Sequence, residues 1–65
     1  MATETFLNLP SDKKEKIIQK GIEIFTKHPY GEASTNQITK ELGISKGSLF
    51  NYFGSKKEFY LFLLR

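Results

Sequence analysis

Cysteine is absent from this 65-residue chain, and histidine occurs once. Without cysteine the chain has neither a disulfide nor a thiolate zinc site to staple a small fold, and one histidine cannot build a metal site by itself. A domain of this size buries only about 60% of its unfolded surface, and small helical bundles manage without staples more often than small β-folds. We therefore expect a single small all-α domain, with neither a metal nor another cofactor.

Long apolar segments are also missing. The longest apolar run, residues 59–64, is far shorter than the ~20 residues that span a bilayer. The first ten residues have no basic start and no apolar stretch, so no signal peptide is predicted. These absences favour a cytoplasmic protein without a membrane partner. The net charge of +3 is a mild basic excess that does not by itself distinguish a nucleic-acid binder from a solvated surface.

Catalytic constellations are equally lacking. The glutamates show no paired spacing of catalytic meaning, and Ser45 and Ser48 have no histidine–acid partner nearby in the sequence. His28 stands beside Pro29 at a predicted helix end, where a surface or helix-dipole role suits it. We do not expect an enzyme.

Residues 1–10 carry no sustained hydrophobic period and end at a proline. We predict a flexible, frayed arm here, as is common at chain termini. Two alternatives stay open: Phe6, Leu7 and Leu9 pack on the body of the domain, or the whole segment is a disordered leader.

The first predicted helix follows this arm. Its N-terminus is expected at a capping box formed by Asp12 and Glu15, with Ser11 as a rival cap, and its end at residue 28, because Pro29 disfavours helical geometry there. Gly21 lies on the apolar face and costs a helix about 1 kcal/mol relative to alanine, so it marks a close helix crossing. The face has helical spacing and consists of Ile17, Ile18, Ile22 and Phe25; Ile24 is off the main stripe, and whether it widens the stripe stays open.

Three more helices are predicted in short succession. Ser34 begins a capping box that opens the second helix, and Gly43 ends that helix in a left-handed conformation. Ser45 caps the third helix. After a break at Gly54, Ser55 begins another capping box that opens the last helix, which is apolar on nearly all sides.

Residues 35–53 therefore contain two helices joined by a glycine turn, the arrangement of a helix-turn-helix. The turn needs a residue that is free to take positive φ, then an aliphatic plug, and then an inward residue about one helical turn later. The predicted core is Ile38, Leu42, Gly43, Ile44, Leu49 and Phe53. With these side chains inside, the start of the third helix projects outward and can enter the major groove of DNA. Base reading would fall to Lys46, Gly47, Ser48, Phe50 and Asn51.

The segment GISKGSLFNYFGSKKEF, residues 43–59, resembles the recognition segment of the TetR family of bacterial repressors. The usual family form is glycine, aliphatic, Ser, any residue, Gly, Thr or Ser, Leu, Tyr or Phe, any residue, His or Tyr, Phe, and then a short turn with Lys and Glu. Residues 43–58 match it nearly position by position, and the likeness extends over about residues 11–65. Two departures are Thr39 in place of the common alanine and Phe50 in place of the more frequent tyrosine.

The resemblance implies roles for individual residues. Base contacts fall to Gly47, Phe50 and Asn51, and phosphate contacts to Thr35, Lys46, Ser48, Tyr52 and Lys56. Tyr52 remains divided between phosphate contact and core. Phe50 lacks the hydroxyl that tyrosine would offer to DNA.

The expected architecture is a homeodomain-like three-helix core plus the start of a fourth helix. We divide the chain into an arm (1–10), a helix-turn-helix domain (11–54) and the start of a helix (55–65) that leads to a further, C-terminal domain for dimerisation and ligand binding. The expected function is sequence-specific binding of double-stranded DNA by a bacterial transcriptional repressor, as a homodimer on a near-palindromic operator and under the control of a small-molecule inducer. The alternative is a helical interaction module that docks a partner through the apolar last helix.

Overall fold

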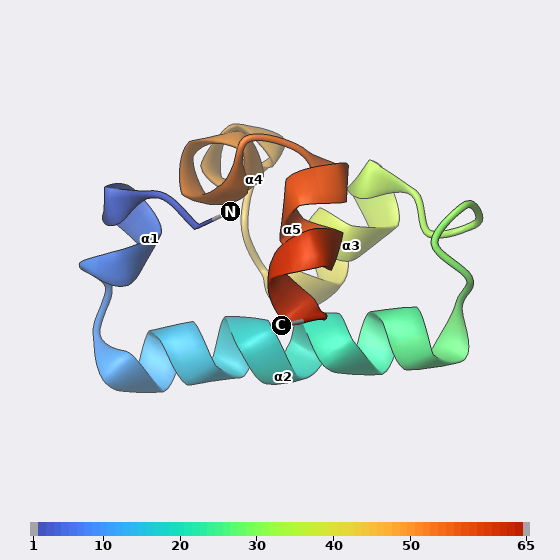
Figure 1. Ribbon diagram of the computed structural model, residues 1–65, viewed down its shortest axis with the longest axis horizontal. Helices are drawn as coiled ribbons and strands as arrows, with labels where there is room; N and C mark the ends of the chain where they lie inside the picture. The colour runs from blue at the N-terminus through green and yellow to red at the C-terminus, as the bar shows by residue number, and fades with distance from the viewer. Residues whose placement is uncertain (1, 65) are drawn as a thin grey trace.

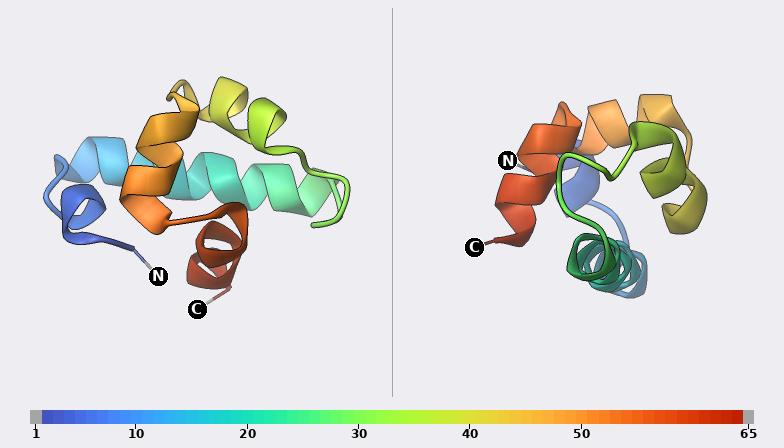
Figure 2. Two further views of the ribbon diagram at one scale, coloured as in Figure 1. Left: turned by 90° about the horizontal axis from the view of Figure 1, so that it is seen from above. Right: turned by 90° about the vertical axis from the view of Figure 1, so that its right-hand side faces the viewer.

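The computed structural model describes residues 2–64, which form a bundle of five helices and no strand. The helices are α1 (Glu4–Leu7), α2 (Ser11–Lys27), α3 (Thr35–Leu42), α4 (Lys46–Phe53) and α5 (Lys56–Leu63). In Figure 1 the long helix α2 runs along one side of the molecule; α3 and α5 pack against it, and α4 lies on the far side of them. Seen from above, α4 lies between α1 and α3 (Figure 2). The predicted all-α fold is confirmed.

The start of α2 differs from the prediction. The helix begins at Ser11, its N-cap is Pro10, and no side chain caps it, so the capping roles assigned to Ser11 and Asp12 are wrong. Pro10 already has the extended backbone of a cap (φ −55°, ψ 147°), and its carbonyl accepts from the N–H groups of Lys13 and Lys14 at 3.1 and 3.0 Å. The helix ends at Lys27 before Pro29, as predicted.

The buried face of α2 does not coincide with the predicted apolar stripe. Ile17, Gly21 and Ile24 are buried, whereas Ile22 is 48% exposed. The reason is the crossing with α5: a Cβ at Gly21 would lie 2.5 Å from Cζ of Phe59. The close crossing predicted from this glycine is confirmed, and it selects the residues one helical turn before and after Gly21 for the core.

An aromatic cluster fills the space between α5 and the helices around it. Phe53 and Phe59 are almost fully buried, with ring centroids 4.6 Å apart. Phe62 lies 5.4 Å from Phe53, and Phe25 lies 6.1 Å from Phe59. Tilted and edge-on ring pairs at these separations are favourable. The aromatic residues in the apolar run of α5 therefore pack into the core of this domain.

The structure differs from the frayed arm expected at the N-terminus. Residues 4–7 form the helical turn α1, and Phe6 is 1% exposed, with its ring 4.7 Å from that of Phe53. Leu9 is partly buried against the core, whereas Leu7 is 53% exposed. One turn with a single deep anchor leaves no hydrophobic period in the sequence, which is why the pattern did not predict this helix.

No helix within residues 2–64 is long and apolar enough to cross a membrane. The last helix, α5, has eight residues. Its outer side exposes Leu61 by 42%, and Leu64 beyond its end is 64% exposed.

Candidate nucleic-acid interface

The turn between α3 and α4 has the backbone geometry of a helix-turn-helix. Gly43 has φ 73° and ψ 29°, a left-handed conformation that costs glycine little and other residues more. Its N–H donates to the carbonyl of Lys40 at 3.2 Å, and the N–H of Ile44 donates to that of Thr39 at 3.0 Å. These bonds close the C-terminus of α3 and turn the chain toward α4.

Apolar side chains behind the turn hold the two helices together. Ile38 on α3 and Leu49 on α4 are 0% exposed, and Phe53 is 1% exposed. Leu42 and Ile44 are partly buried and pack against this cluster. The angle between α3 and α4 therefore rests on a continuous apolar wall.

Thr39 occupies the helix crossing where the family pattern has alanine. The residue is 6% exposed, and its Oγ1 donates to the carbonyls of Thr35 and Asn36 at 3.0 and 3.1 Å. Because the hydroxyl is satisfied within its own helix, no polar group is left unpaired by burial. The crossing thus accommodates the bulkier residue.

Helix α4 has two distinct faces. Leu49, Tyr52 and Phe53 are buried, whereas the side exposed to solvent consists of Lys46, Gly47, Phe50 and Asn51. Phe50, at 51% exposed, has no role in the core. The three residues predicted to contact bases, Gly47, Phe50 and Asn51, therefore lie together on the open face of one helix.

Serine caps the N-termini of α3, α4 and α5. The Oγ atoms of Ser34, Ser45 and Ser55 accept from backbone N–H groups three residues later, at 3.1, 3.0 and 3.1 Å. The three predicted N-caps are confirmed. The return bond of the first capping box is not made, because the side chain of Gln37 donates to Glu41 at 3.3 Å. A capped helix start carries a partial positive charge that suits phosphate oxygens.

The residues predicted to contact phosphate lie in different surroundings. Lys46 is exposed at the start of α4, and Thr35 and Ser48 are half-buried. The Oγ of Ser48 lies 3.1 Å from that of Ser45, so both hydroxyls belong to the cap of α4. Tyr52 is 9% exposed, with its ring 6.0 Å from that of Phe6.

Lys56 has protein partners that the sequence did not reveal. Its Nζ donates to the carbonyls of Tyr30 and Ala33 at 3.1 and 3.0 Å, and it lies 4.4 Å from the centroid of the Tyr30 ring. These contacts join the start of α5 to the loop between α2 and α3. The neighbouring Lys57 is exposed.

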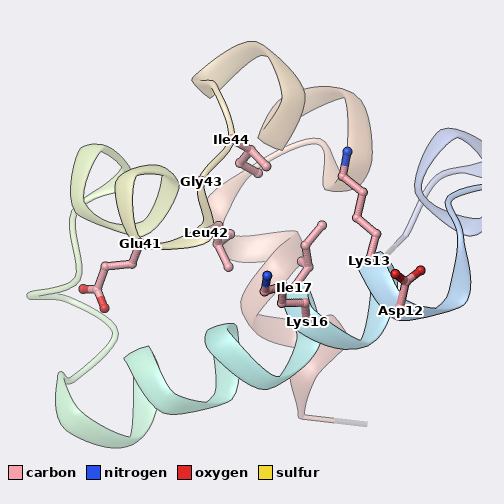
Figure 3. Close-up of a pocket in the computed structure, with 8 residues that line it drawn as sticks. All are labelled: Asp12, Lys13, Lys16, Ile17, Glu41, Leu42, Gly43 and Ile44. Atoms are coloured by element: carbon pink, nitrogen blue, oxygen red, sulfur yellow. The ribbon is translucent and has the colours of Figure 1, made fainter.

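An open groove of about 560 Å³ lies between the start of α2 and the turn. Figure 3 shows Ile44 and Leu42 on one side of it and Ile17 on the other, with Lys13 extending from α2 toward α4. Lys13 is exposed and lines this groove, a position near the turn that the sequence pattern did not predict.

Thr3 is a second residue that sequence reasoning missed. Its N–H donates to the carbonyl of Tyr52 at 2.8 Å, and its Oγ1 lies 2.5 and 3.0 Å from the carbonyls of Asn51 and Tyr52. A lone threonine in a segment without periodicity gives no signal of such a contact.

Comparison with known proteins agrees with this geometry. Residues 17–62 match the family model described as bacterial regulatory proteins, tetR family. The chain is 37% identical over 51 residues to the HTH-type transcriptional regulator YerO of Bacillus subtilis, which covers 78% of the chain and 18% of the relative. It is 38% identical over 47 residues to IcaR of Staphylococcus aureus, the negative transcriptional regulator of the biofilm operon icaADBC, covering 72% of the chain and 25% of IcaR.

A solved structure shares the same fold. The crystal structure of a TetR family transcriptional regulator from Chloroflexus aurantiacus superposes with a TM-score of 0.84 at 44% sequence identity, over 95% of this chain and 29% of that one. This chain thus spans less than a third of the length of these relatives. The chain belongs to the tetR family of bacterial regulatory proteins, and its helix-turn-helix is the DNA-binding domain of that family.

Proposed function

We propose that this domain binds a specific DNA sequence by placing α4 in the major groove. The observation that carries the proposal is the outer face of α4, where a lysine, a glycine, an exposed phenylalanine and an asparagine stand clear of the core. A helix needs such a face to reach base edges, and the capped turn before it fixes the direction in which the face points.

The three base-reading residues act in different ways. Asn51 offers an amide that can pair with the N6 and N7 positions of adenine. Phe50, exposed and apolar, suits the methyl group of thymine. Gly47 lets the backbone of α4 approach the base edges, because it has no side chain to keep them apart.

Phosphate contacts would hold the domain in register along the duplex. Lys46 and Ser48 at the start of α4, together with Thr35 at the start of α3, combine side-chain donors with helix N-termini. Tyr52 would contribute through its hydroxyl. That hydroxyl makes no hydrogen bond within residues 2–64, and no buried side-chain oxygen in that range lacks a partner, so the hydroxyl is open to solvent. Lys56 would offer phosphate the one ammonium hydrogen that Tyr30 and Ala33 leave unused.

For the complete protein we propose a cytoplasmic transcriptional repressor that works as a homodimer on a near-palindromic operator. Its half-sites would lie one helical turn of DNA, about 34 Å, or a multiple of it apart. Two relatives support repression: IcaR is named a negative transcriptional regulator, and AcnR of Corynebacterium glutamicum, 29% identical over 56 residues, is named a transcriptional repressor. Dimerisation and binding of a small-molecule inducer would reside in a C-terminal domain outside these 65 residues.

A protein-interaction module is the weaker alternative. In that reading Phe59 and Phe62 would dock a partner helix. Phe59 is instead 0% exposed, and the Phe62 ring lies 5.7 Å from that of Phe6, so both side chains already have partners in this domain. The burial of these rings favours DNA binding by α4.

Fluorescence anisotropy of the 65-residue chain on labelled duplexes tests the proposal. Affinity for a random duplex should fall with salt, with each lysine–phosphate contact contributing about 0.9 to the slope of log K against log salt. Lys46→Ala should weaken binding to every duplex and flatten that slope, whereas Asn51→Ala should mainly relax the preference for a selected duplex.

Lys20→Ala serves as the matched control, because Lys20 is also exposed but lies on α2. Its removal should change the salt slope less than removal of Lys46. Salt-independent binding by the wild-type chain, or equal losses on selected and random duplex for Lys46→Ala and Asn51→Ala alike, would contradict the proposal.

A further inference from the structure

The N-terminal segment, residues 2–9, reaches the last turn of α4, where Asn51, one of the proposed base-reading residues, lies. We propose that this segment is a clamp that positions the recognition helix, and that Thr3 is the positioning residue through which it sharpens base discrimination. The inference rests on the proposed base-reading role of Asn51. It assigns a part in DNA recognition to a segment that precedes residues 17–62, the stretch matched by the family model.

The contact is made to backbone groups that a helix cannot satisfy by itself. The last carbonyls of an α-helix have no partner within the helix. In α4 the carbonyl of Phe50 accepts from the N–H of Gly54 at 2.8 Å, and those of Asn51 and Tyr52 accept from Thr3. Thr3 thus provides the donors for two consecutive carbonyls, from a position 48 and 49 residues earlier in the chain.

Thr3 is itself held in place by the rest of the segment. Its carbonyl accepts from the N–H of Leu7 at 3.0 Å, and Thr3 is the N-cap of the helical turn α1. A single helical turn is not stable by itself, and Phe6 supplies the tertiary contact. The Phe6 ring is 4.7 Å from Phe53 and 6.0 Å from Tyr52, so the anchor and the hydrogen bonds act on the same end of α4.

The position of this end matters for base reading. Asn51 lies in the last turn of α4, and Gly54 with φ 93° follows as the link to α5. Glycine restrains the chain least of all residues, so the link by itself holds the end of α4 loosely. An amide–base hydrogen bond weakens steeply when its angle or length departs from the optimum. A second attachment, from Thr3 to the backbone carbonyl of Asn51, would therefore favour the correct base pair over the wrong one.

Point variants in the full 65-residue chain test the clamp. Thr3→Val removes the hydroxyl and keeps the shape, Thr3→Ser keeps the hydroxyl, and Thr5→Val is the matched control. Thr5 is exposed on the same helical turn, and its side chain makes no hydrogen bond within residues 2–64. The probes are a duplex enriched from a randomised pool by the wild-type chain and a random duplex of equal length. The readout is the ratio of the two affinities, measured at a temperature where every variant is folded by circular dichroism.

Thr3→Val should lower this ratio by about two- to tenfold, the range that corresponds to loss of one hydrogen bond, while Thr3→Ser and Thr5→Val keep the wild-type ratio. If Thr3 has a purely structural role, Thr3→Val lowers both affinities by the same factor and leaves the ratio unchanged, and this result would overturn the inference. An equal fall of the ratio for Thr5→Val would also overturn it. Failure of the proposed function would look different: the wild-type chain itself would bind both duplexes equally.

Discussion

Gly47 offers a way to separate the stability of the domain from its contact with DNA. Gly47 lies in the first turn of α4, and a Cβ placed there would meet only the Oγ of Ser45, at 3.8 Å. That distance is ordinary van der Waals contact, so the fold has room for a methyl group. Glycine costs a helix up to about 1 kcal/mol relative to alanine. Gly47→Ala should therefore stabilise the domain by up to about 1 kcal/mol, which raises the melting temperature by roughly 4–8 °C in a domain of this size.

The effect on DNA binding should have the opposite sign. If the backbone of α4 lies against base edges at Gly47, the added methyl group either displaces the helix or breaks contacts made by its neighbours. A loss of about 1.4 kcal/mol in binding corresponds to tenfold in affinity, and we expect Gly47→Ala to lose at least about that much on the selected duplex. Thermal unfolding followed by circular dichroism and fluorescence anisotropy on the same samples provide the two numbers.

Gly31→Ala is the control for this experiment. Gly31 lies in the loop between α2 and α3, and a Cβ there would have nothing within 4 Å. This variant should bind DNA as the wild type does. A Gly47→Ala domain that melts higher and keeps full affinity would refute the reasoning, because it would show that DNA does not approach the backbone of α4 at this point.

Three further predictions concern stability. Gly21→Ala should lower the free energy of unfolding by a net ~1–2 kcal/mol, because overpacking against Phe59 costs about 1–3 kcal/mol and better helix propensity returns ~1 kcal/mol; an unchanged urea midpoint would show that the ring yields freely. Lys56→Met should cost about 1–3 kcal/mol by removing two hydrogen bonds from a charged donor, whereas Lys57→Met should cost less than about 0.5 kcal/mol; equal midpoints for the two variants would contradict the structural role of Lys56. Ser45→Ala should cost about 1 kcal/mol through loss of the α4 cap, and a melting temperature equal to the wild type would show that this cap contributes nothing.

Local signals predicted much of this fold correctly. The serine caps at Ser34, Ser45 and Ser55 and the left-handed glycine at Gly43 depend on hydrogen bonds and backbone angles within a few residues. Such features are decided by neighbouring residues in the chain, so they can be read from the sequence. The close crossing at Gly21 was also predicted, since a glycine inside a helix needs a reason to be there.

The failures share a different cause. Whether Ile22 or Ile24 enters the core depends on the direction from which α5 approaches α2. The spacing of apolar residues within α2 does not specify that direction. The cap of α2 was misplaced because Pro10 already provides the extended backbone that a cap needs. The ordering of Thr3 and Phe6 depends on partners about 50 residues later, at the end of α4.

The sequence by itself thus determined the number and order of the main helices, the turn between α3 and α4 and the family to which the chain belongs. Helical period, caps and glycine positions carry that information over short distances along the chain. Only the tertiary structure decided that Lys56 holds a loop with two of its three donors, and that Thr3 sits behind Asn51. Both contacts join residues more than twenty positions apart, so they exist only once the packing of Phe6, Phe53 and Phe59 has brought the helices together.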